Sequence, residues 1–129
     1  MNIAKIFYRF SLITISILVI SCDSDDAIAP KNREIKFEVS GTFSGTLDAT
    51  YITASAGGTN ESIPTLPWTK NISYSSSAPS TGITVGGSGG VSGQSLTVKV
   101  FAGERLVSTT PGVSNNMGIV VVASPSYVF

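Results

Sequence analysis

The sequence predicts an all-β fold, a β-sandwich of about seven short strands over residues 33–129. Serine, threonine and glycine are abundant while charged residues make up only 12% of the chain, and this composition favours strands and turns. Apolar and polar residues also alternate with a period of two, and turn signals recur about every 8 to 12 residues, as in sandwiches. A small barrel is the alternative. No segment predicts a helix longer than one turn.

The first two strands are expected on either side of a glycine break. Residues 34–40 alternate between polar and apolar side chains, the pattern of a strand with one buried face. Gly41 to Gly45 interrupts this pattern, and residues 47–51 resume it. The two segments therefore predict a pair of antiparallel strands.

A third substantial strand is expected after two prolines. Gly57 to Asn60 predicts a turn, and Pro64 and Pro67 forbid a central strand between them. From Trp68 to about Ser75, side chains of one parity suit a buried face. That parity favours a core position for the tryptophan, and a binding-face aromatic is the alternative.

Loops and glycines separate the next elements. The polar residues 75–82 predict a loop. Ile83 and Val85 then mark a short strand, which we expect to end before the glycine run 86–90. This run lacks a following Gly-Lys-Ser/Thr and a helix, so we interpret it as a strand connection and not as a phosphate-binding loop.

The last third of the chain predicts a hairpin and one further strand. Residues 96–100 alternate, a turn falls at 102–104, and residues 105–109 form the returning strand. After a break that contains Pro111, the run Ile119–Val122 is apolar without interruption. Such a run is typical of a strand that is covered on both faces.

The N-terminus has the features of a cleaved signal. Basic residues, Lys5 and Arg9, precede an apolar segment at 10–20, which is too short for a comfortable membrane span. Val19-Ile20-Ser21-Cys22 resembles the bacterial lipoprotein signal, in which the cysteine receives a diacylglyceryl group. We therefore predict a signal peptide at 1–21, lipidation of Cys22 and attachment to a membrane through the lipid. An ordinary secretory signal or an N-terminal span is the alternative.

An acidic tract follows the cysteine. Asp23, Ser24, Asp25 and Asp26 resemble the export signal of surface lipoproteins in the Bacteroidetes, while a solvated linker or a weak cation site are the other interpretations. Residues 22–32 are then a flexible acidic tether, and residues 33–129 form the single domain. We expect the protein in the outer membrane, with the cell surface favoured over the periplasmic face, which is the alternative.

Charge and residue types exclude several functions. Removal of Lys5 and Arg9 with the signal leaves six basic and eight acidic residues, net −2, which is no nucleic-acid footprint. The chain has no histidine and one cysteine, so the Ser-His-Asp, Cys-His and common zinc arrangements are excluded. We expect no cofactor, no metal and no enzymatic activity. The acidic residues of the domain are interpreted as solvated surface groups; they are Glu34, Glu38, Asp48, Glu61 and Glu104.

Several short motifs occur along the predicted strands and turns. The most specific is Leu66-Pro67-Trp68-Thr69-Lys70. The others are Phe37-Glu38-Val39-Ser40-Gly41, Ala49-Thr50-Tyr51-Ile52-Thr53, Gly57-Gly58-Thr59, Leu96-Thr97-Val98-Lys99-Val100, Gly103 and Leu106-Val107. Together they span roughly Glu34 to Ser108 and resemble the soluble domain of the MmpS family of small membrane-anchored accessory proteins.

The MmpS resemblance implies an immunoglobulin-like β-sandwich without catalytic residues that is a partner of RND-type exporters. Two features differ from the family pattern: a lipoprotein signal stands in place of a membrane helix, and a common cysteine pair is missing. With the signal, this predicts a lipid-anchored, non-enzymatic binding or accessory module for membrane transport. The alternative is a surface-exposed ligand-binding or adhesive lipoprotein, suggested by the acidic tract and the Ser/Gly-rich loops at 75–82 and 86–93.

Overall fold

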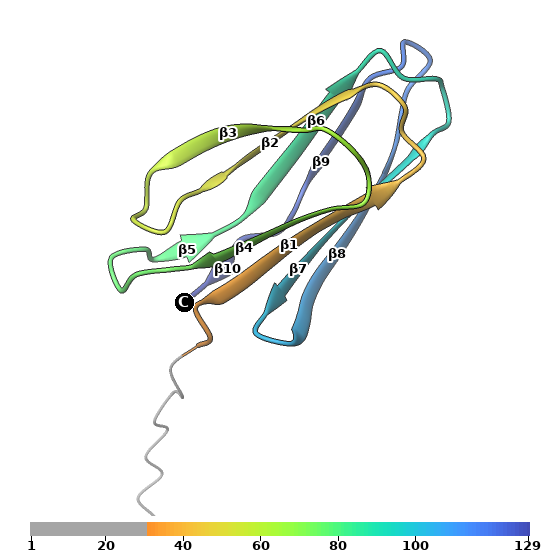
Figure 1. The fold of residues 1–129 in the computed structure, drawn as a ribbon. Coiled ribbons are helices and arrows are strands. Elements are labelled where there is room, and N and C mark those ends of the chain that lie inside the picture. The colour runs from red at the N-terminus through yellow and green to blue at the C-terminus, as the bar shows by residue number, and fades with distance from the viewer. Residues whose placement is uncertain (1–30) are drawn as a thin grey trace, which may run out of the picture.

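The computed structural model describes residues 31–129, and this part of the chain forms ten strands and no helix (Figure 1). The predicted all-β sandwich is confirmed, with more strands than the seven expected. The strands are β1 (Glu34–Gly41), β2 (Thr46–Ile52), β3 (Gly58–Ile63), β4 (Trp68–Ser73), β5 (Ser80–Thr81), β6 (Ile83–Ser88), β7 (Ser95–Ala102), β8 (Arg105–Val113), β9 (Val120–Ala123) and β10 (Tyr127–Val128).

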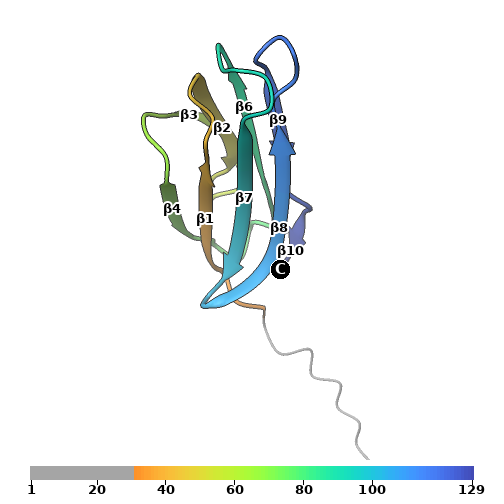
Figure 2. The ribbon, with the colours of Figure 1, turned by 90° about the vertical axis from the view of Figure 1, so that its right-hand side faces the viewer.

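Eight strands form two antiparallel sheets that face each other. Sheet A has the order β4-β1-β7-β8 and sheet B the order β3-β2-β6-β9, while β10 pairs with β5 alone (Figure 2). The chain crosses between the two main sheets after β1, β3, β6 and β8, and also between β4 and β6 by way of β5. In the constant-type immunoglobulin order the first two strands share a sheet. Here β1 pairs with β4 and β7 instead, so the architecture is that of a sandwich with its own strand order.

Alternation along each strand builds the core between the sheets. In β1 the residues Ile35, Phe37 and Val39 are buried while their neighbours face outward, and β7 repeats the pattern. Sheet B contributes the inward side chains of β2, β6 and β9. This is the expected result of period-two sequences in a sheet with one covered face.

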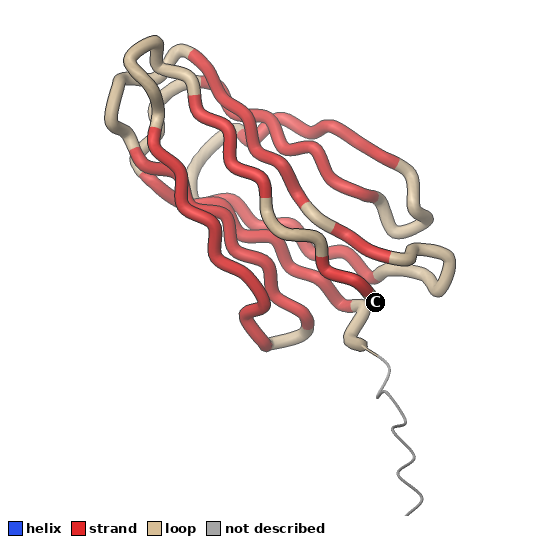
Figure 3. Tube along the Cα trace, turned by 180° about the vertical axis from the view of Figure 1, so that it is seen from behind, coloured by secondary structure: helices blue, strands red, loops and turns tan. Residues whose placement is uncertain are grey.

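The two ends of the sandwich differ. We call the end where Lys31 and Phe129 lie the proximal end and the opposite end the distal end (Figures 1 and 3). Strand directions place loops 42–45, 64–67, 89–94 and 114–119 at the distal end. The Ser/Gly-rich segments at 75–82 and 86–93 therefore point to opposite ends and do not form one surface.

C-terminal aromatic residues close the proximal end. The ring centroids of Tyr74 and Phe129 are 5.2 Å apart, and the Arg33 guanidinium lies 4.5 Å from the Phe129 centroid. Nη1 of Arg33 also donates hydrogen bonds to the carbonyls of Ser75 and Ala78, at 2.6 and 2.9 Å. Arg33, at the start of the domain, therefore contacts both the C-terminal residue and the segment after β4.

The glycine run is partly strand, so the prediction that the strand ends before residue 86 is wrong. An added Cβ at Gly87 would lie 2.5 Å from Leu47 and 2.7 Å from Phe43. An added Cβ at Gly90 would lie 2.3 Å from the same phenylalanine ring. Because Phe43 is buried, these glycines allow a close approach that any side chain would prevent.

Two edge strands, β8 and β9, differ from the prediction. β8 passes through Pro111 to Val113, beyond the predicted end at residue 109, because an edge strand tolerates a residue that lacks an N–H. β9 is the edge of sheet B, and Val121 is 68% exposed. The prediction of a strand covered on both faces is therefore wrong.

The middle of the chain also holds more strand than expected. β3 begins at Gly58, and the turn comes earlier, where the Thr53 amide donates a hydrogen bond to the Gly57 carbonyl. The expected loop at 75–82 contains β5.

Candidate functional site

The predicted lipidation and export residues, Cys22 and Asp23, Ser24, Asp25 and Asp26, lie outside the described residues. The first described strand begins at Glu34, close to the predicted start of the domain at residue 33.

The motif Leu66-Pro67-Trp68-Thr69-Lys70 spans the end of the β3–β4 connection and the start of β4. Leu66 and Trp68 are partly buried and pack against the core, whereas Pro67 and Thr69 are exposed. Trp68 therefore lies on the core side of β4, as its parity predicts, although its ring is not fully enclosed. The motif residues have separate surroundings and do not converge on one pocket.

Lys70 instead takes part in a polar cluster that bridges the two sheets. Its Nζ lies 2.9 Å from Oε2 of Glu61 on β3, and the Tyr51 hydroxyl on β2 donates to the same oxygen at 2.5 Å. The register places Glu61 opposite Ala49 and Lys70 opposite Phe37, so both charges lie at inward positions of edge strands. Glu61 is still 38% exposed, as a solvated group would be, but it lies on the inward parity of β3 and pairs with Lys70.

The cluster changes the proton affinity of its members. Hydrogen bonds from Tyr51 and Lys70 lower the pKa of Glu61. Burial raises the pKa of Tyr51, and the hydrogen bond to Glu61 raises it further. The hydrogen bond to Glu61 raises the pKa of Lys70. The cluster is thus an ionised pair with a neutral tyrosine at neutral pH, which suits a structural bridge.

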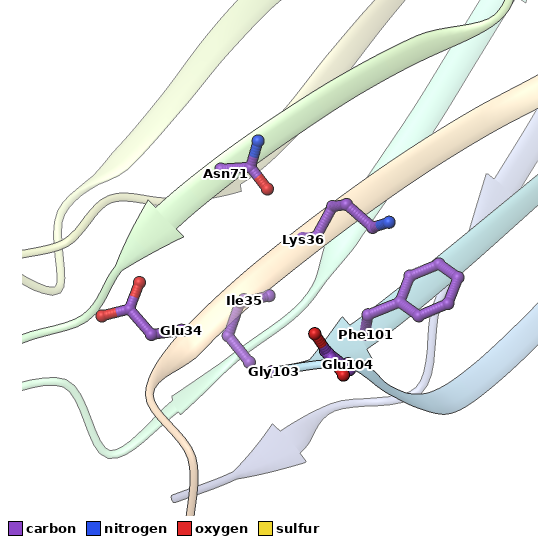
Figure 4. A pocket seen from close by; sticks show the side chains of 7 residues that line it. All are labelled: Glu34, Ile35, Lys36, Asn71, Phe101, Gly103 and Glu104. Carbon is purple, nitrogen blue, oxygen red and sulfur yellow. The ribbon is translucent and has the colours of Figure 1, made fainter.

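A shallow depression lies on the outer face of sheet A near the proximal end (Figure 4). Its volume is about 250 Å³, and Glu34, Lys36, Phe101 and Glu104 are among its lining residues. The Lys36 ammonium lies 4.2 Å from the Phe101 centroid and 4.0 Å from Glu38. The Glu34 carboxylate accepts a hydrogen bond from a serine on β4. Lys36 and Glu34 thus have polar partners on neighbouring residues, as on an ordinary solvated face.

A larger groove, with a volume of about 450 Å³, crosses the outer face of sheet B. Hydroxyl, amide and carboxylate side chains line it, together with glycine and one valine. The lining residues are Thr46, Asp48, Thr50, Asn60, Thr84, Gly86, Gly87, Ser88 and Val121. Asp48 is exposed, as the sequence predicts, whereas the groove itself is not predictable from the sequence pattern.

Hydrogen bonds hold the loops of the distal end together. The Gln94 Oε1 atom accepts hydrogen bonds from the amides of Ser44 and Val91, at 3.1 and 2.9 Å. Ser114 is buried, and its hydroxyl donates to the Val91 carbonyl and accepts from the Gln94 amide. The Asn115 side-chain oxygen accepts hydrogen bonds from two backbone amides of its own loop, those of Met117 and Ile119. Three loops are thereby fixed relative to one another.

This fixed end carries exposed apolar side chains and no charge. Val91 is 63% exposed and Met117 71% exposed, and Val113 and Ile119 are exposed beside them in sequence. The loops 42–45, 64–67, 89–94 and 114–119 contain no Asp, Glu, Lys or Arg. Exposed apolar side chains on a rigid and uncharged support suit a contact with another protein.

No family model matches the chain, and no curated protein is significantly similar to it. Over residues 31–129 there is no helix that could cross a membrane. The same residues bring no three His, Cys, Asp or Glu side chains together as a metal-binding group.

Proposed function

We propose that this protein is a lipid-anchored, non-enzymatic binding or accessory module of the bacterial outer membrane, which contacts a protein partner through its distal end. The observation that carries this proposal is the set of locked, uncharged loops that present Val91 and Met117 to solvent. Exposed apolar groups on fixed loops lose little conformational entropy on binding, so they favour a stable complex.

The proposed anchor agrees with this orientation. Lys31 comes nine residue steps after Cys22, and an extended chain of that length spans at most about 30 Å. The anchor would therefore hold the proximal end close to the lipid and leave the distal end free to meet another envelope protein. The MmpS resemblance names an RND-type exporter as the first partner to test.

The anchor is tested by Cys22→Ala. The variant should lose its acyl chains and appear in the soluble fraction, because one covalent lipid attachment is then removed. Recovery of the variant in membranes after a high-salt wash would contradict the lipoprotein proposal.

The distal contact is tested by crosslinking in living cells. A photo-crosslinkable residue at Met117 should form an adduct with an RND-type exporter. The matched control is the same residue at Val128, which is 56% exposed but lies at the proximal end. No adduct at residue 117, or equal exporter adducts from both positions, would contradict the proposal.

A second function is favoured by the groove on sheet B: the protein is a ligand-binding lipoprotein on the cell surface. The groove has hydrogen-bonding side chains that the core does not need. Protease treatment of intact cells separates the two candidates. Digestion of the domain in intact cells supports the surface function, while protection until lysis supports the exporter partnership.

A further inference from the structure

The outer faces of the two sheets have different side chains. Sheet A carries long charged and aromatic residues on its outer face, including Glu34, Lys36, Lys99 and Phe101. The groove on sheet B is lined only by short side chains, with no Lys, Arg, Glu or aromatic residue among them. Long charged side chains are the common cover of a solvated sheet face, so the groove is an exception that leaves the strand surface open.

Gly86 forms the floor of the groove. It pairs with Asp48 on one side and Val121 on the other, and an added Cβ there would meet no atom within 4 Å. Its neighbour Gly87 is required by packing, but Gly86 has neither a close contact nor a positive φ to explain it. Glycine in a strand interior weakens the strand, and it often marks a position where a ligand approaches the backbone.

The polar groups around this floor are already oriented. The Ser62 hydroxyl donates to Oδ1 of Asp48 at 2.7 Å, and the Asn60 amide donates to the Thr50 hydroxyl oxygen at 3.1 Å. These bonds leave the second carboxylate oxygen, the amide carbonyl and the Thr84 hydroxyl free to bond with a ligand. Both donors and acceptors are therefore available among the lining residues of the groove.

The charge of the groove selects among ligands. Its single carboxylate, Asp48, disfavours anions, and no second acidic residue is present to hold a polycation. Val121 adds an apolar wall beside the hydroxyl groups. A neutral molecule that has many hydroxyl groups and a C–H face matches this combination.

From this geometry we infer that the groove binds a neutral oligosaccharide, with Asp48, Thr50 and Asn60 as hydrogen-bonding residues and Gly86 as the floor. The inference rests on the second of the two proposed functions. The groove is open and lacks an aromatic platform, so the dissociation constant should be weak, on the order of 1 mM. Many copies on one cell would still give firm attachment through multivalency.

The test uses the purified acylated full-length mature protein in a detergent without a sugar headgroup. Saturation-transfer NMR with cellohexaose, maltohexaose and mannohexaose at 10 mM should show transfer to at least one of them. Gly86→Val should weaken that binding at least tenfold by filling the floor. Gly58→Val is the matched control, because it is another sheet B glycine with open space around it and lies outside the groove.

Asp48→Ala gives a second measurement that does not depend on the fold of the glycine variant, and it too should weaken binding at least tenfold. Transfer to none of the three oligosaccharides, or equal binding by wild type and both groove variants, would overturn the inference. Salt-sensitive binding of oligogalacturonate in their place would also overturn it. Because the assay uses purified protein, these outcomes are independent of the protease result that decides cell-surface exposure.

Discussion

At the scale of single residues, the Tyr51–Glu61–Lys70 cluster explains how one side of the sandwich is closed. Edge strands expose unpaired backbone groups, and inward-pointing charges are one way to prevent them from pairing with other chains. β3 and β4 are both edge strands, and each has such a charge. Each charge is neutralised by the other across the gap between the sheets.

Glu61→Gln should make thermal stability less dependent on pH on the acidic side. The pKa of Glu61 is lowered from its ordinary value of 4.5, so its contribution is present above that value and is lost as pH falls through the folded-state pKa. The difference in melting temperature between wild type and variant should therefore be largest near pH 7 and shrink below about pH 4. A constant difference from pH 7 to pH 3 would contradict this role.

Trp68→Ala should destabilise the domain moderately. The ring packs against the core but is only partly buried, so we expect a loss of about 2 kcal/mol, below the 3–5 kcal/mol of a fully enclosed aromatic. Phe37→Ala, at a fully buried position, is the comparison and should reach that higher range. Urea unfolding followed by circular dichroism measures both. Equal losses for the two variants would show that Trp68 is a full core residue.

At the scale of elements, β6 shows what a local pattern can and cannot predict. Alternation predicted the core positions of β1, β2 and β7, because side-chain direction follows from the strand period alone. Gly86 and Gly87 look alike in sequence, yet one lies over open space and the other under Phe43. Their roles depend on which strands pair beside β6, and that order is set by the whole fold.

The dependence on strand pairing also explains why the inward position of Glu61 and the groove on sheet B were not predicted from the sequence. The inward parity of Glu61 follows from the strand β3, which begins at Gly58, where the sequence predicts a turn over 57–60. The groove on sheet B needs the alignment of four strands. The exposure of Val121 likewise depends on β9 being an edge.

The two adjacent glycines offer a matched pair of variants. Gly87→Val should cost about 1–3 kcal/mol through overpacking against Leu47 and Phe43. Gly86→Val should leave stability unchanged or raise it slightly, because a β-branched residue there meets no atom and suits a strand. The free energy of unfolding in urea, followed by Trp68 fluorescence, measures both. An equal loss at the two positions would contradict the assigned roles.

At the scale of the whole molecule, charge is distributed unevenly. No charged residue occurs from Leu106 to Phe129, the segment that supplies most of β8 together with β9, β10 and the distal loop 114–119. The charges of the described residues lie instead on sheet A, on the β3–β4 side and near the proximal end, with Asp48 alone in the groove of sheet B. A molecule of this kind can present separate surfaces for a protein contact at the distal end and for a polar ligand on one face.

Removal of Tyr127, Val128 and Phe129 tests how far the proximal closure stabilises the whole domain. Deletion removes the pairing of β10 with β5, uncovers Tyr74 and frees Arg33 from the Phe129 ring. Loss of two partly buried aromatic side chains should cost about 2–4 kcal/mol, seen as a lower urea midpoint in Trp68 fluorescence. Val128→Ser is the control: its side chain is largely exposed, so it should change stability by less than about 0.5 kcal/mol. If the truncated protein unfolds at the wild-type midpoint, the two sheets hold together without the C-terminal closure.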